Sequence, residues 1–79
     1  MSELESNIEA LIFCSPKPIK INHIQKIFFE YDKKKYKFEN IQSAIQNLKN
    51  KYQQNNYPIE IIESGGGFQF FPKNKFPKQ

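Results

Sequence analysis

The stretch FENIQSAIQNLKNKYQQN, residues 38–55, decides the fold. Its large apolar side chains recur at intervals of three and four residues, which is the period of one face of a helix. They are Phe38, Ile41, Ile45, Leu48 and Tyr52, with Ala44 beside them. No glycine or proline interrupts the stretch, and Pro58 soon after it cannot continue a helix. The sequence therefore predicts a long amphipathic helix whose apolar face the rest of the chain covers.

An earlier helix is predicted to begin near residue 3 or 7, because SELE (residues 2–5) and SNIE (residues 6–9) both fit the capping box S-x-x-E. Its inward stripe should consist of Leu4, Ile8, Leu11 and Ile12. Three more residues widen its apolar face toward the C-terminal end, namely Ala10, Phe13 and Cys14. A two-helix packing does not need this extra surface. Two interpretations stay open: part of it contacts another chain, or it belongs to the core.

The prolines of SPKP (residues 15–18) should end this helix, and Ile19 with Lys20 can form a very short strand. A second helix is predicted from about Ile21 to Tyr31. Its inward residues should be Ile21, Ile24, Ile27, Phe28 and Tyr31, with Phe29 on the flank. The lysine-rich residues 32–37 are predicted to form an exposed loop.

After Pro58 the apolar period changes from 3.6 to 2, which is typical of strands. Residues 59–63 and 68–71 are predicted to pair as a hairpin that Pro72 closes. Its turn contains Gly65, Gly66 and Gly67, since glycine supplies the positive φ angles that hairpin turns demand. If Ile61 and Phe70 face the helices, Ile62 and Phe71 face outward. Apolar outer faces next to edge strands recruit partners.

The predicted order α-β-α-α-β-β is that of an α+β winged helix-turn-helix fold, with three helices and a C-terminal β-hairpin wing. We expect one domain over residues 1–73 and a frayed tail over residues 74–79. A chain of 79 residues buries too little surface to be very stable alone. One cysteine excludes an internal disulfide, and one cysteine with one histidine cannot fill a zinc shell. Association is the remaining way to bury more area.

The net charge of +4 is unevenly distributed. Seven of the twelve lysines lie in two appendages: Lys33, Lys34, Lys35 and Lys37 in the loop, and Lys73, Lys75 and Lys78 in the tail. The other five lysines accompany eight acidic residues, so the body should be mildly acidic. No apolar run approaches the ~18 residues that span a bilayer, and no signal peptide opens the chain. We therefore expect no membrane contact and a cytoplasmic location.

The residues contain no catalytic set. His23 is expected alone on the surface, and Cys14 lies inside an apolar helical run, where it should be small and buried. The glycines at 65–67 lead into Phe68-Gln69-Phe70 and a strand, whereas a phosphate-binding loop leads into Gly-Lys-Ser/Thr and a helix. The acidic residues show no metal-site spacing. We predict no enzyme activity, no cofactor, no metal and no small-molecule substrate; an enzyme would need a site assembled across a partner interface.

A DNA-binding winged-helix transcriptional regulator is the alternative function. The third helix enters the major groove when this fold binds DNA. Its solvent face should show Asn40, Gln42, Ser43, Gln46, Asn47, Lys49, Asn50 and Gln53. Asn and Gln can recognise adenine, but affinity comes mainly from neutralised phosphates, and glutamates flank the wing. We therefore expect direct DNA binding to be weak or absent. A weak nucleic-acid contact by Lys33, Lys34, Lys35 and Lys37 stays open beside a merely solvated loop.

Four segments resemble one known family. They are IEALIF (residues 8–13) followed by a Pro-Ile turn, LKNKY (48–52), IEIIE (59–63) and GGFQF (66–70). Together they resemble segregation and condensation protein B, ScpB, and the similarity runs from about Glu3 to Lys73. The pair IEIIE and GGFQF is the most specific part. The lysine-rich loop is longer than the family's usual turn, and Lys20 and Lys37 stand near where the family often has serine caps.

The resemblance implies a non-enzymatic subunit of the bacterial SMC–kleisin condensin complex, which acts in chromosome condensation and segregation at the nucleoid. ScpB proteins contain two tandem winged-helix domains, form homodimers largely through the first, and bind the kleisin ScpA, which bridges the SMC heads. This chain resembles that first domain, so it is expected to be a fragment of a longer protein. From patterning alone, we expect the dimer or partner interface to involve Ala10, Phe13, Ile62 and Phe71.

Overall fold

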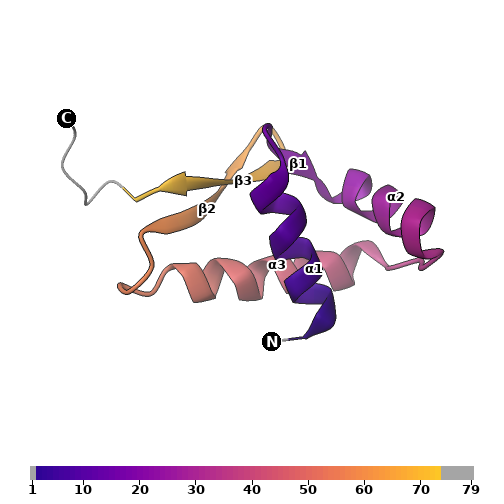
Figure 1. Cartoon of the computed structure of the whole chain (residues 1–79), viewed down its shortest axis with the longest axis horizontal. Helices are drawn as coiled ribbons and strands as arrows, with labels where there is room; N and C mark the ends of the chain where they lie inside the picture. The colour runs from indigo at the N-terminus through magenta and orange to yellow at the C-terminus, as the bar shows by residue number, and fades with distance from the viewer. Residues whose placement is uncertain (1, 74–79) are drawn as a thin grey trace.

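Within residues 2–73, which this computed structural model describes, three helices and three strands follow one another in the predicted order (Figure 1). The helices are α1 (Glu3–Cys14), α2 (Ile21–Asp32) and α3 (Phe38–Tyr52), and the strands are β1 (Ile19–Lys20), β2 (Ile59–Ser64) and β3 (Gly67–Pro72). The winged-helix prediction is confirmed. The prediction of a frayed tail falls on residues 74–79, outside the described residues.

The helix starts follow from local chemistry. The hydroxyl of Ser2 accepts a hydrogen bond from the backbone N–H of Glu5 at 3.1 Å, so α1 begins at the first of the two predicted capping boxes. Lys20 and Lys37 precede α2 and α3 without a side-chain cap. α2 nevertheless begins at Ile21, as predicted, and α3 begins at Phe38.

The core lies where α1 crosses α3 and where β3 packs beneath α1 (Figure 1). Its fully buried side chains are Ile8, Ile12, Ile24, Ile41, Ile45 and Leu48, which come from the predicted stripes of all three helices. The prediction that Tyr31 faces inward is wrong, because its side chain is 80% exposed. Phe38 is also about half exposed, at 47%. Tyr31 lies near the end of α2, and Phe38 is the first residue of α3.

Tyr36, in the connection between α2 and α3, packs against Phe28. Its ring meets Phe28 edge to face at 5.3 Å between centroids, and its carbonyl accepts a hydrogen bond from the Gln25 amide at 2.9 Å. The lysines around Tyr36 are exposed, as predicted. The Tyr36 ring and the hydrogen bond to its carbonyl therefore help to hold the lysine-rich segment against α2.

The three strands form one antiparallel sheet in the order β1-β3-β2. Ile61 pairs with Phe70, and both face the helices, as predicted. The chain reverses through Gly65 and Gly66, whose φ angles of 58° and 83° suit a type I′ hairpin turn. Gly67 belongs to β3 and pairs with Lys20 of β1. A Cβ atom there would lie 2.9 Å from the Pro18 carbonyl carbon, so this position needs glycine for close backbone approach.

Candidate protein interaction surface

The C-terminal half of α1 exposes apolar side chains that no other element within residues 2–73 covers. Phe13 is 72% exposed, and Ala10, one helical turn earlier, is exposed as well. Cys14 is also exposed, so the prediction of a buried cysteine is wrong. Cys14 is the last residue of α1 and lines a groove between α1 and α2. We define the α1 surface as Ala10, Phe13, Cys14 and the two grooves that flank them.

The first groove separates α1 from α2 and has a volume of about 400 Å³. Apolar side chains dominate its lining, which consists of Asn7, Ala10, Leu11, Cys14, Ile27, Phe28, Tyr31 and Asp32. The exposed ring of Tyr31 therefore borders this groove instead of joining the core. Sequence patterning missed this role, since it placed Tyr31 on the inward stripe of α2.

The second groove, of about 290 Å³, separates α1 from the sheet and the end of α3. Its lining consists of Ser6, Glu9, Ala10, Phe13, Tyr52 and Phe70. The Phe70 ring lies 6.3 Å from Phe13 and 5.0 Å from Tyr52, both edge to face, so aromatic contacts brace the exposed Phe13. Ala10 lines both grooves, so its small side chain lies between them.

The other two predicted interface residues lie elsewhere. Ile62 and Phe71 are 38% and 41% exposed, on the face of the sheet that points away from the helices. Phe71 directly follows Phe70, and successive strand residues point to opposite faces. Ile62 pairs with Gln69, and Glu60 pairs with Phe71, so these four side chains share the outer sheet surface. The structure therefore brings Ala10 together with Phe13, and Ile62 with Phe71, on two separate surfaces.

A half-buried polar cluster lies at the edge of the second groove. The carboxylate of Glu9 accepts hydrogen bonds from the Lys51 ammonium, at 3.1 Å, and from the Tyr52 hydroxyl. Burial raises the pKa of Glu9, but the hydrogen bonds from Tyr52 and Lys51 outweigh it, and the net pKa is lowered. Burial and the bond to Glu9 raise the pKa of Tyr52. This cluster is structural: it ties α1 to α3.

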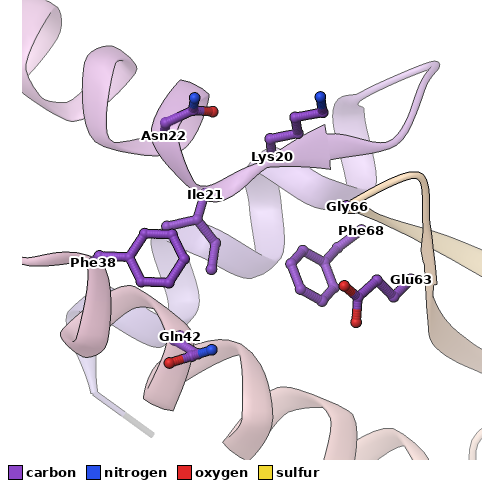
Figure 2. A pocket seen from close by; sticks show the side chains of 8 residues that line it. All are labelled: Lys20, Ile21, Asn22, Phe38, Gln42, Glu63, Gly66 and Phe68. Atoms are coloured by element: carbon purple, nitrogen blue, oxygen red, sulfur yellow. The ribbon is translucent and has the colours of Figure 1, made fainter.

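A pocket of about 290 Å³ opens where the starts of α2 and α3 meet the tip of the hairpin (Figure 2). Figure 2 shows the rings of Phe38 and Phe68 on either side of it, with the Phe38 ring against Ile21. This contact explains why Phe38 is only partly exposed. Lys20 and Glu63 supply the charged groups, and Asn22, Gln42 and Gly66 complete the lining. The pocket thus has one carboxylate and one ammonium group at its rim. Its lining contains no nucleophile with a neighbouring base.

Several lysines of the predicted nucleic-acid elements contact other side chains. The ammonium groups of Lys33 and Lys35 lie 5.8 and 5.4 Å from the Phe29 ring, and Lys34 forms an exposed ion pair with Glu3 at 3.8 Å. On α3, the predicted polar face is solvent-facing, but Lys51 is engaged with Glu9. Exposed lysines keep their charge in such contacts, so a weak nucleic-acid contact by Lys33, Lys34, Lys35 and Lys37 stays a prediction.

Other chemistry finds little support among residues 2–73. His23 is exposed, as predicted, on a different helix from Cys14. Within this part of the chain, no three His, Cys, Asp or Glu side chains gather as a metal site would require. None of the described helices is long and apolar enough to span a membrane.

Comparison with known proteins relates the chain to one family. The sequence profile described as segregation and condensation complex subunit ScpB matches residues 6–78. Among individually curated proteins, none matches. One similar solved structure, a dimer of the ScpB N-terminal domain complexed with ScpA peptide, superposes with a TM-score of 0.78 at 17% identity, over 95% of this chain and 83% of that chain.

A second similar structure is a conserved hypothetical protein from Chlorobium tepidum. It superposes with a TM-score of 0.71 at 24% identity, over 94% of this chain. This chain spans only 43% of the length of that protein. At these identities both structures establish the fold, and the family rests on the profile match.

Proposed function

Because the chain belongs to the family of the segregation and condensation complex subunit ScpB, we propose that it is a non-enzymatic winged-helix subunit of an SMC–kleisin condensin complex. In this role it forms a homodimer and binds the kleisin ScpA, and through ScpA it joins SMC in chromosome condensation and segregation. The family match over residues 6–78 carries this proposal. The solved ScpB N-terminal domain, a dimer with a bound ScpA peptide, supports it by analogy.

The α1 surface is the proposed homodimer contact. A two-fold axis makes an interface self-complementary, so each partner must offer both a protruding and a receiving group. Phe13 protrudes at 72% exposure, and Ala10 lies one turn away between two grooves. In an antiparallel packing of two α1 helices, Phe13 of one copy covers Ala10 of the other. Burying one phenylalanine per copy is worth about 2 kcal/mol on each side.

The outer sheet surface is the proposed kleisin contact. Ile62 and Phe71 are both exposed there, and an antiparallel α1 packing leaves them free. They lie diagonally across the β2–β3 pair, which spaces them for two apolar side chains of one bound segment. The α1 surface and the outer sheet surface can thus be occupied at the same time.

A titration with ScpA from the same organism tests the kleisin contact. Calorimetry should detect binding to the wild-type chain and a loss of about tenfold or more in affinity for Ile62→Lys, since a buried apolar contact is replaced by a charge. Phe13→Lys is the matched control, which should retain the intrinsic affinity per chain. Equal binding by Ile62→Lys and the wild type would show that the outer sheet surface is not the kleisin contact.

A further inference from the structure

The outer edge of β2 has backbone groups available for another strand. β2 lies at the end of the sheet, and among residues 2–73 only β3 pairs with it. Beyond the last strand pair, the Lys73 N–H donates to the Pro58 carbonyl at 3.0 Å. Hydrogen-bonded pairs alternate along antiparallel strands, so Glu60, Ile62 and Ser64 bond toward β3. The N–H and C=O groups of the intervening residues, Ile59, Ile61 and Glu63, point to the open side.

These open groups have no partner within the described residues. No backbone or side-chain hydrogen bond between residues 2 and 73 reaches the N–H or C=O of Ile59, Ile61 or Glu63 on that side. The register between β2 and β3 is continuous over six pairs, so no bulge bends the edge away. β2 also contains no proline and no lysine, which commonly protect edge strands.

The charges along β2 indicate which kind of strand fits. Glu60 and Glu63 have no ion pair with any described side chain. They lie three residues apart and therefore on opposite faces of the sheet. A strand added beside β2 places one residue next to each glutamate, with a spacing of three in its own sequence. The two residues of the added strand between these positions lie beside Ile61 and Ile62. The residue that follows the position next to Glu60 lies beside Ile59.

We propose that the outer edge of β2 pairs with an extended segment of a partner protein in which two basic residues are three positions apart and the residues between and after them are apolar. Main-chain hydrogen bonds supply the binding, and the alternate side chains supply the specificity. A second copy of β2 fits poorly, because both strands would bring two glutamates and no lysine. This inference goes beyond the proposed dimer and kleisin contacts and does not depend on either.

The test uses the synthetic peptide TKVVKVT and the whole isotope-labelled chain in an NMR titration. When this peptide pairs antiparallel to β2, its first lysine lies beside Glu63 and its second beside Glu60. We expect shift changes and slowed amide exchange centred on Ile59, Ile61 and Glu63. The acidic peptide TEVVEVT should bind about tenfold more weakly, because two favourable cross-strand charge pairs become unfavourable ones. The double variant Glu60→Lys/Glu63→Lys should reverse this preference. The dispersion of its NMR spectrum tests whether the variant is folded.

Backbone methylation of the peptide separates strand pairing from simple charge attraction. Methylating the N–H of the second valine, which faces β2, should abolish binding. Methylating the first valine, which faces away, should change affinity little. The proposal is overturned if both methylated peptides bind alike, if basic and acidic peptides bind equally or not at all, or if the shifts map to another surface. Protection of the β2 amides that rises with protein concentration alone would also overturn it, in favour of self-pairing.

Discussion

The carboxylate of Glu9 on α1 lies 3.1 Å from the ammonium of Lys51 on α3, and the Tyr52 hydroxyl donates to the same carboxylate. This contact links the two helices that cross at the centre of the fold. It also lies at the rim of the groove that contains Phe13 and Phe70. The position of the α1 surface therefore depends on a group that titrates.

The first prediction concerns acid stability. The pKa of Glu9 is lowered in the folded chain, so Glu9 contributes stability above the ordinary glutamate pKa and loses that contribution as pH falls through its folded pKa. Tyr52→Phe removes one of the bonds responsible and should raise the Glu9 pKa. It should also cost about 1 kcal/mol at neutral pH and less in acid. Carboxyl NMR titration and urea unfolding measure the two effects.

Tyr57→Phe is the matched control for Tyr52→Phe. The Tyr57 ring lies 4.9 Å from the Tyr52 ring, tilted by 58°, but makes no hydrogen bond to Glu9 among the described contacts. Its substitution should leave the Glu9 titration unchanged. An equal change of the Glu9 pKa in both variants would mean that aromatic packing, and not the hydroxyl, lowers it.

A second prediction compares two glycines of the hairpin. Gly67→Ala places a methyl group 2.9 Å from Pro18 and should destabilise the fold by about 1–3 kcal/mol through overpacking. Gly65 has nothing within 4 Å of the added atom and a φ of 58°, which asparagine tolerates. Gly65→Asn should therefore change the free energy of unfolding by less than about 0.5 kcal/mol. Similar losses in the two variants would contradict the close approach of Gly67 to Pro18.

The third prediction concerns the end of α2. Lys33 follows Asp32 in the left-handed conformation, with a φ of 58°, where residues with a side chain are strained. Lys33→Gly should stabilise the chain by about 0.5 kcal/mol, since relief of strain exceeds the added freedom of the unfolded state. Lys34→Gly, one residue later, should give no gain. The midpoint of urea unfolding distinguishes the two.

Some features of the fold could be predicted from the spacing of apolar residues, and others could not. The long helix, the short strand at Ile19 and the inward position of Phe70 followed from apolar period and proline placement, which local sequence encodes directly. Tyr31 and Tyr36 did not: which ring packs on Phe28 depends on where α2 ends relative to α1. The sequence also could not predict that Phe13 and Ile62 lie on separate surfaces, because this depends on how α1 packs across the sheet.

The fourth prediction addresses DNA. Among the polar side chains on the outer face of α3 Lys49 is the one cation, Lys51 is paired with Glu9, and Glu60 and Glu63 lie along the wing. We expect no sub-micromolar binding to duplex DNA at physiological salt. Any binding at low salt should fall steeply with added salt and weaken when Lys33, Lys34, Lys35 and Lys37 are replaced by glutamine. Tight, sequence-dependent binding that survives this replacement would support the regulator function instead.

The oligomeric state of the chain tests the central claim most directly. In sedimentation velocity over a concentration series, the wild-type chain should form a dimer. Phe13→Lys should weaken that dimer by about a hundredfold or more, because a two-fold contact loses the same side chain twice. Ile62→Lys, on the outer sheet surface, should dimerise like the wild type. A chain that stays monomeric at every concentration, or a dimer that Ile62→Lys disrupts and Phe13→Lys does not, would contradict the account.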